Sequence, residues 1–505
     1  MSKLSLIDRD SIESRKTKVE KMGNGMRRGA LSVKDQVCRK IIEFGILGLI
    51  VWVPLPKASV HEWSILVMQV AVFVMMGAYV LMGQKPYNNE LLDTALRWPR
   101  YLFYAVFALI LVQIIPFPNF LVKILSPRSY VFREMYAPDF SGIKFMRFSL
   151  MPGHTLMQGL ELLAYFLVGF LIVKTVTRRS QIMRIFYFIV GMGVFQAFYG
   201  FFELYNPIPR VLFYKKLHYL DCVTGTFVNR NHFSGYLEMV IPLALGLILA
   251  RTDLFSLSGK KWKEKILKIS EKGVYKNLLL TLAVILMALA IILSKSRSGV
   301  FLVVLTFILV FGMAVLYFGR VRQQQKWIKS FLKVTFLIIV LMALYIGIDA
   351  TIERFAMDNI LEEVRPVVWS NTTGIIGDFP VFGSGLGTFE ALYPAYEESS
   401  TPPLFEHAHN DYLEYLAELG VVGFVMLLGG ILVMLVFSFL MWKVRRHPEV
   451  KGLALGGMVA VVAMLVHSIT DFNLHIPANM MLFAVVLSLT VVTAFYKRNQ
   501  GSNKE

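Results

Sequence analysis

The segment "GVVGFVMLLGGILVMLVFSFLM" (residues 420–441) contains no charged side chain along its whole length. A helix of about 20 apolar residues is long enough to cross the hydrocarbon core of a bilayer. The residues just before it, "EHAHNDYLEYLAEL" (406–419), carry two histidines, an asparagine and several carboxylates. The sequence therefore predicts a membrane-spanning helix with a polar cluster at one end, and the chemistry of that cluster depends on which side of the membrane it faces.

The composition of the whole chain agrees with a membrane location. Of its 505 residues 56% are hydrophobic and 17% are charged, whereas soluble domains carry about 25% charged residues. We therefore expect an all-α, polytopic integral membrane protein. The formal net charge of +18 could indicate a nucleic-acid partner, but basic cytoplasmic loops explain it, and no nucleic acid is expected. Two cysteines, Cys38 and Cys222, give no disulfide framework.

Apolar runs divide the chain into three parts. Residues 1–40 are basic and polar and lack a signal-peptide pattern, which predicts a cytoplasmic tail. Residues 41–498 form the membrane domain, and 499–505 the cytoplasmic C-terminus. We predict about twelve spans, at 41–55, 63–83, 101–121, 159–175, 184–204, 233–250, 277–293, 299–318, 331–349, 420–441, 452–469 and 478–496.

The basic residues predict the orientation of these spans. With the N-terminal tail inside, inner segments hold 38 of the 52 Lys and Arg residues, as the positive-inside tendency requires. Both termini are then cytoplasmic. This orientation collects the unusual polar motifs on the outer face: "NRNHFSG" (229–235), "SKSRSG" (294–299), the loop 350–411 and "TDF" (470–472). A connection as long as 350–411 is usually functional or disordered, and its aromatic content favours order.

The polar cluster at 407–414 has three interpretations. Asp411 and Glu414 have the spacing of a helix start, with Asp411 as N-cap and the Glu414 side chain accepting from the backbone N–H of Asp411. His407, His409 and Asp411 spell H-x-H-x-D, which could bind zinc, although the next residue, Tyr412, breaks the longer metallohydrolase pattern, and no metal is expected. A neutral histidine acting as general base suits the site better.

Arginines at the outer face are candidates for an anionic ligand. Arg297 in "SKSRSG" and Arg230 in "NRNH" stand at span ends. A charged side chain at such a position either extends to the polar membrane interface or binds a ligand. In "RPVVW" (365–369), Pro366 predicts a helix start, so that Arg365 projects from it with Trp369 one turn on; the alternative for Arg365 is an ion pair with a neighbouring glutamate. Guanidinium groups bind phosphate in bidentate fashion, so several together indicate an anionic headgroup.

The run "FGSGLGT" (382–388) does not indicate a nucleotide site. Spaced glycines are weak evidence by themselves, no strand–helix pattern flanks them, and the outer face offers no ATP. We expect these glycines to serve tight turns.

Four motifs together resemble a known family. "GTFVNRNHFSGYLEM" (225–239), "SKSRSG", "RPVVW" with "GDFPVFGSGLGTFE" (377–390), and "HAHNDYLEYLAELGVVGF" (407–424) occur in the order found in the O-antigen ligase and polymerase superfamily. The resemblance implies a GT-C-like helical glycosyltransferase of the bacterial inner membrane, with 350–411 as its large periplasmic catalytic loop. His409 matches the essential loop histidine, and Arg365 and Arg297 match arginines that contact pyrophosphate. Arg230 is expected to bind the pyrophosphate together with them, and His407, Asn410, Asn231 and Trp369 are expected to support the site.

The family implies the substrates and the reaction. The donor would be a glycan linked to undecaprenyl pyrophosphate, and the acceptor a hydroxyl of a glycan, a lipid A core or a protein, with inversion at the sugar and no metal or cofactor. Ligase and polymerase remain open alternatives. A transporter of a small anionic or glycan-lipid solute is the rival class, and Glu238 inside the sixth span is the residue that would favour it.

Overall fold

The computed structural model describes residues 32–86, 90–136, 143–208, 210–250, 272–318, 337, 359–397 and 405–497. Across these ranges the regular secondary structure is helical apart from two small antiparallel ladders, which confirms the all-α prediction. The ladders pair β1 (Phe117–Pro118) with β2 (Phe145–Met146), and β3 (Arg210–Val211) with β4 (Tyr214–Lys215).

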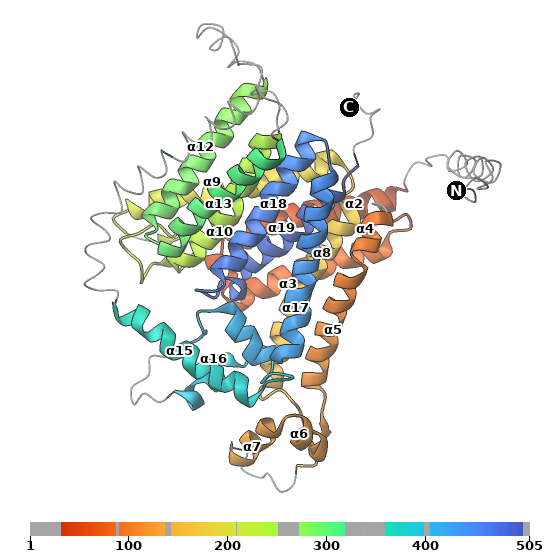
Figure 1. Cartoon of the computed structure of the whole chain (residues 1–505), viewed down its shortest axis with the longest axis vertical. Helices are drawn as coiled ribbons and strands as arrows, with labels where there is room; N and C mark the ends of the chain where they lie inside the picture. The colour runs from red at the N-terminus through yellow and green to blue at the C-terminus, as the bar shows by residue number, and fades with distance from the viewer. Residues whose placement is uncertain are drawn as a thin grey trace, which may run out of the picture.

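Long helices make up the bundle in Figure 1. Their bounds are α2 Val33–Trp52, α3 Glu62–Leu81, α5 Arg97–Ile114, α8 Pro152–Thr175, α9 Arg179–Leu204, α10 Arg230–Ala250, α12 Lys272–Leu293, α13 Arg297–Phe318, α17 Asp411–Val444, α18 Pro448–His467 and α19 Pro477–Phe495. The remaining elements are η1 Lys57–Ser59, α4 Glu90–Ala95, α6 Asn119–Leu125, α7 Pro127–Tyr136, α15 Asn359–Asp378, α16 Phe389–Leu392, η4 Tyr393–Tyr396 and η5 Asn473–His475.

Nine helices within the described ranges are long and apolar enough to cross a membrane. They coincide with nine of the twelve predicted spans, so the multi-pass prediction is confirmed, whereas the count of twelve stays a prediction. The predicted span 331–349 lies outside the described residues. The other two exceptions are 41–55 and 101–121, which fall on α2 and α5.

The sequence placed the limits of α2 and α5 wrongly. Helix α2 begins at Val33, inside the predicted tail, because the Ser32 side chain caps it by accepting from Asp35 N. It ends at Trp52, just before "VPLP". Helix α5 ends at Ile114, seven residues before the predicted limit, because Pro116 keeps the preceding residue out of the helical region.

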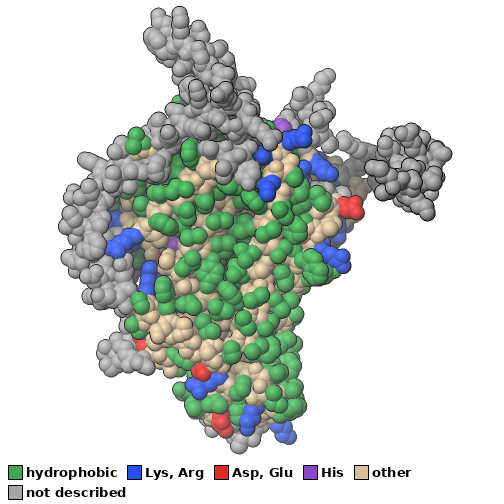
Figure 2. Space-filling model, in the orientation of Figure 1, with side chains coloured by type: hydrophobic (Ala, Val, Ile, Leu, Met, Phe, Trp, Pro, Cys, Tyr) green, Lys and Arg blue, Asp and Glu red, His purple; other side chains and the backbone are tan. Residues whose placement is uncertain are grey.

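The centre of the bundle is formed by α10, α18 and α19, whose apolar windows are 100%, 83% and 94% buried. Glycines let α10 and α18 approach closely: a Cβ on Gly456 would lie 2.4 Å from Pro242 O, and one on Gly452 would lie 2.5 Å from Ala250 N. Small residues at such crossings are typical of helices that pack inside membranes. Figure 2 shows hydrophobic side chains over the flank of the bundle, with charged side chains gathered toward its two ends.

The segment 359–397 lies beyond one end of the bundle, where Figure 1 also places α6 and α7. Its residues Val368, Ile375, Phe379, Phe389, Leu392 and Tyr393 form a small core together with Ala408 and with Ala417 of α17. Three of the aromatic residues that the sequence singled out in the long loop, Phe379, Phe389 and Tyr393, belong to this core. The rest of the predicted loop 350–411 lies partly outside the described residues.

Candidate active site

Five segments distant in sequence meet at the end of the bundle next to α15. They are the first turns of α10 and α13, residues 405–410 before α17, the connection 468–476 between α18 and α19, and α15 itself. These segments contain the polar motifs that the sequence assigned to a single face. Their common location is thus confirmed, and the side of the membrane they face stays a prediction.

His409 is held in an unusual backbone conformation at the start of α17. Its φ is +51°, in the left-handed region that few residues other than glycine adopt. The next residue, Asn410, is the N-cap, and its side chain accepts from Tyr412 N at 3.0 Å and Leu413 N at 3.2 Å. The prediction that Asp411 caps this helix is wrong, because the carboxylate of Asp411 is used elsewhere: it accepts from Leu474 N at 3.0 Å.

Asp471 connects the predicted catalytic and arginine residues. Its Oδ1 lies 3.4 Å from His409 Nδ1 and 3.6 Å from His232 Nε2. Its Oδ2 accepts from Asn231 Nδ2 at 2.8 Å and lies 4.0 Å from Arg365 Nη2. The side chain is 1% exposed. Burial alone raises the pKa of Asp471, but the polar contacts with His232 and His409 outweigh it and hold this pKa well below the usual range.

Arg297 and Arg230 stand at the first positions of α13 and α10, next to residues that belong to this network. Ser296 Oγ donates to Asn231 Oδ1 at 2.9 Å, so the residues preceding Arg297 and following Arg230 are bonded to each other. The Arg230 guanidinium also lies 5.2 Å from the centre of the Tyr219 ring. The structure therefore brings all three predicted arginines to the end of the bundle next to α15, which we call the rim.

A buried pair anchors this rim to the core of the bundle. Ser298 Oγ and His467 Nε2 are 2.9 Å apart, and His467 Nδ1 lies 2.9 Å from Glu238 Oε2. Glu238, which the sequence flagged as a transporter feature, is thus engaged with the end of α18. This contact fixes the first turn of α13, where Arg297 stands.

Trp369 supports the histidine loop from α15. Its indole Nε1–H donates to Ala408 O at 3.0 Å, one residue before His409. The prediction that Pro366 starts this helix is wrong, because α15 already begins at Asn359 and Pro366 lies inside it. Arg365 and Trp369 nevertheless share the helix, as predicted, and both reach the site.

His407 belongs to a second cluster, separated from the first by the Phe472 ring. The His407 ring stacks on Phe472 with centres 4.2 Å apart, while the His409 and His232 rings meet Phe472 edge-on at 4.9 and 4.5 Å. The H-x-H-x-D residues therefore do not converge on one point. Instead, His407 Nδ1 bonds to Glu414 Oε1 at 2.7 Å.

His475 completes this second cluster. Its Nδ1 lies 2.7 Å from Asp411 Oδ1, and its Nε2 lies 3.4 Å from Glu414 Oε1. Burial alone lowers the pKa of His475, but the carboxylates of Glu414 and Asp411 raise it to about 10. The cluster thus strongly favours a positive charge on the ring of His475.

The sequence did not assign roles to Asp471, Phe472, His232 and His475. Two of them stand in "TDF" and one in "NRNH", motifs already singled out as polar groups at span ends. A charged residue at a membrane boundary is a signal for function. That signal was present at Asp471. Its contacts with Asn231 and His232 of α10 and with His409 before α17 could not be inferred from spacing.

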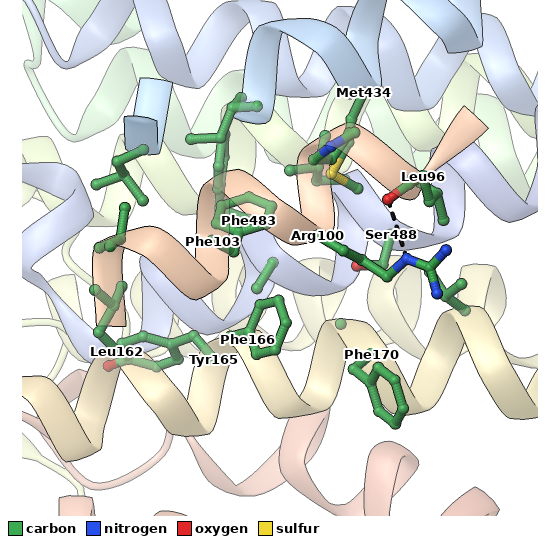
Figure 3. Close-up of a pocket in the computed structure, with 18 of the residues that line it drawn as sticks. Leu96, Arg100, Phe103, Leu162, Tyr165, Phe166, Phe170, Met434, Phe483 and Ser488 are labelled. Carbon is green, nitrogen blue, oxygen red and sulfur yellow. Dashed lines mark hydrogen bonds between the residues drawn. The ribbon is translucent and has the colours of Figure 1, made fainter. Parts of the chain in front are cut away.

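One cavity adjoins the second cluster, and another shares part of its lining. One has a volume of about 110 Å³ and polar walls that include Glu161, Glu414 and Glu418. The other, of about 100 Å³, is apolar and lies between α5, α8, α17 and α19; Figure 3 shows Phe103, Phe166 and Phe483 among the side chains around it. Both cavities are lined in part by Leu162, Tyr165 and Met480.

The glycines of "FGSGLGT" serve turns, as the sequence predicted. Gly383, Gly385 and Gly387 all have positive φ, and a Cβ on Gly383 would lie 2.1 Å from Glu418 O. Gln113 of α5 ties the turn to α17 by donating to Phe382 O at 2.6 Å and to Glu418 O at 2.9 Å. The two cysteines are free and buried, in agreement with the expectation that they do not pair.

The fold and the site define a multi-pass helical membrane protein with histidines and arginines around a buried carboxylate at one end of its bundle. Residues 282–428 match the family model described as O-antigen ligase. This segment includes Arg297, Arg365 and His409, and the match confirms the predicted resemblance to the O-antigen ligase and polymerase superfamily. It supports a glycosyl-transfer role in surface polysaccharide synthesis, with a lipid-linked glycan donor and a glycan acceptor in general terms. No curated protein matches the chain.

Proposed function

We propose that the protein transfers a glycan from undecaprenyl pyrophosphate to an acceptor hydroxyl at the periplasmic face of the bacterial inner membrane, with both termini in the cytoplasm. The observation that carries this proposal is that His409 and Arg365 lie within 3.4 and 4.0 Å of the same carboxylate, Asp471. A proton acceptor and a cation are thereby placed side by side at one rim. Transfer of a sugar from a diphosphate needs both.

His409 acts as the general base in this proposal. Its Nδ1 faces Asp471, so Nε2 is the nitrogen left to take the proton of the acceptor hydroxyl. As that oxygen attacks the anomeric carbon, a new glycosidic bond forms, the bond from the sugar to the diphosphate breaks, and the diphosphate leaves with the electron pair. A single displacement inverts the configuration at this carbon.

The arginines stabilise the departing diphosphate. Negative charge develops on its oxygens in the transition state, and guanidinium groups fixed in advance stabilise such charge without reorganisation. Arg365 is held on the rigid helix α15, and Arg297 and Arg230 stand at helix starts whose neighbours are bonded to each other. We therefore propose that the transfer itself proceeds without a metal ion at the diphosphate.

The apolar cavity offers a place for the chain of a lipid-linked substrate. It opens between four helices of the membrane bundle, and its walls are aromatic and aliphatic side chains. Lys174 and Asp93, which bond to each other at 2.6 Å, line it together with Arg100. Since the cavity shares walls with the polar cavity near His407, a chain lying in it would lead toward the site.

The proposal is tested with purified protein, a lipid-linked glycan and a hydroxyl acceptor. His409→Ala is expected to lower transfer about 10²–10⁴-fold, the usual contribution of a general base, and Arg365→Ala about 10²–10³-fold, the loss typical of one preorganised donor. His218→Ala and Arg210→Ala are matched controls, because both side chains are exposed and lie outside the network. Undiminished transfer by the His409 variant would refute the mechanism, and transfer should persist in EDTA.

The choice between ligase and polymerase depends on the acceptor. Both use the same donor and the same chemistry, so the site described above is compatible with either. Analysis of surface glycan in a deletion strain separates them: glycans of a single repeat identify a polymerase, whereas full-length glycan left on the carrier lipid identifies a ligase.

A further inference from the structure

His407, Glu414 and His475 form a set of metal-ligand atoms that comes from three separate points of the chain. One ligand atom from each lies within 4.8 Å of the others. The closest distances are 2.7 Å from His407 Nδ1 to Glu414 Oε1 and 3.4 Å from His475 Nε2 to Glu414 Oε1. Ligand atoms of a tetrahedral zinc, each about 2.1 Å from the ion, are about 3.4 Å apart, so small rotations of the side chains suffice.

The surroundings of these residues orient them toward a common point. Asp411 Oδ1 bonds to His475 Nδ1 at 2.7 Å, which leaves Nε2 facing Glu414. A carboxylate on the outer nitrogen of a ligating histidine is the arrangement that fixes such ligands in zinc proteins. Glu414 is itself held, because its Oε2 accepts from Ala408 N at 2.8 Å.

Two buried polar atoms here lack a hydrogen-bond partner among the described residues. They are Nε2 of His475 and Oε2 of Glu418. Glu418 is 2% exposed and lines the same polar cavity as the three ligands. A buried atom of this kind costs free energy unless an unseen group satisfies it, and both atoms here can face a cation or its water.

The polar cavity carries the charge that a cation needs. Its walls include Glu161, Glu390, Glu406, Glu414 and Glu418, and its volume of about 110 Å³ leaves room for water ligands. Two imidazoles and one carboxylate suit zinc, which takes three protein ligands and a water at open sites.

We infer that His407, Glu414 and His475 bind a zinc ion, with water from the polar cavity as the fourth ligand. The ion joins the loop before α17 to η5, and so fixes the stretches that carry His409 and Asp471. The Phe472 ring lies between this cluster and His409, so the ion stabilises the site and takes no part in the transfer step. The stripped protein therefore remains active below its unfolding temperature.

Zinc binding by the full-length protein in detergent tests this inference. The protein is purified with a tag that lacks histidines, stripped with EDTA and titrated with ZnCl₂ alone; bound metal is counted by mass spectrometry, and the unfolding temperature is measured with and without zinc. We expect one zinc per chain and a higher unfolding temperature. His475→Ala should lose both effects, and Asp411→Asn should bind zinc about 10–100-fold more weakly. His154→Ala is the matched control, since His154 lines the same cavity outside the ligand set.

The outcomes separate cleanly. Zinc uptake that is the same in wild type and in the folded Glu414→Gln and His475→Ala variants would overturn the inference, as would the absence of uptake by the wild type. Size-exclusion profiles show whether the variants are folded, and Glu414→Gln keeps the size of the side chain if His475→Ala does not fold. The titration contains no donor or acceptor, so its failure leaves the transferase proposal standing, and failure of transfer leaves the zinc result standing.

Discussion

Replacing Asp471 by Asn is the substitution that probes the proposed site most directly. Asn has the same size, so the packing around position 471 is preserved. It removes the negative charge that lies 3.4 Å from His409 Nδ1 and 4.0 Å from Arg365 Nη2. The amide also has one acceptor oxygen where the carboxylate had two, so either Asn231 Nδ2 or the backbone N–H of Phe472 loses its acceptor.

The distances set the size of the expected effect. When His409 takes the acceptor proton, its new positive charge is stabilised by Asp471 by about 5 kcal/mol at 3.4 Å with an effective dielectric constant of about 20. The His409 side chain is 26% exposed, and water and Arg365 weaken this interaction. We therefore expect transfer to fall about 10²–10³-fold, which corresponds to about 3–4 kcal/mol of the activation free energy.

The assay is transfer of a lipid-linked glycan by the purified variant, with Asp221→Asn as the matched control. Asp221 lies at the same end of the bundle, pairs with Lys295 and is 73% exposed. Loss of such an exposed pair changes the free energy of unfolding by about 1 kcal/mol or less, so the control should keep its activity. Transfer by Asp471→Asn within about threefold of wild type, in protein that unfolds at the same temperature, would refute the assigned role of Asp471.

The low pKa of Asp471 adds a pH test. A carboxyl whose pKa is lower in the folded state stabilises the protein above the pKa of the unfolded chain, and this contribution is lost as pH falls through the folded-state pKa. The stability difference between wild type and Asp471→Asn should therefore not shrink between pH 7 and about pH 4 and should decrease only below it. Convergence of the two unfolding temperatures already between pH 7 and pH 5 would contradict the lowered pKa.

Three further substitutions test how the site is supported. Gly420→Ala should lower the free energy of unfolding by at least about 1–3 kcal/mol, since φ is +64° there and the new Cβ would lie 2.3 Å from Val381 O; unchanged thermal unfolding would contradict this. Asn410→Ala should cost about 0.5–2 kcal/mol through the lost N-cap, whereas Asn410→Asp should retain most of it; equal losses in both variants would count against the cap. Trp369→Phe removes the bond to Ala408 O and should cost about 0.5–1.5 kcal/mol and lower transfer; an unaffected transfer rate would show that this bond does not hold the histidine loop.

The sequence predicted the parts of the site that lie within single motifs. Arg297 and Arg230 were selected because charged residues at the ends of apolar runs are rarely there for packing alone, whereas the roles expected for His409 and Arg365 came from the resemblance to the family. The structure brings them to one rim. The predicted helix start before the apolar run was also correct, but its cap is Asn410.

Partners distant in sequence could not be predicted. Asp471 contacts Asn231, 240 residues away, and His475 contacts Asp411, 64 residues away. Local periodicity carries no information about such pairs, because they depend on which helix ends the bundle places together. The same limit explains why Asp411 was assigned to the cap: spacing shows that a carboxylate can cap a helix, whereas tertiary contacts decide that it bonds to His475.

The sequence by itself determined that this chain is a helical bundle in a membrane. In lipid, a single apolar run of this length can satisfy the hydrogen bonds of its backbone N–H and C=O groups only as a helix. The sequence also determined which polar motifs would meet at one end, because successive spans alternate in direction. Only the tertiary structure decided that Asp471 joins His409 to Arg365, and that His407 turns away to Glu414 and His475. Those choices depend on side-chain geometry at the ends of packed helices, where one ring, Phe472, separates two sets of charges.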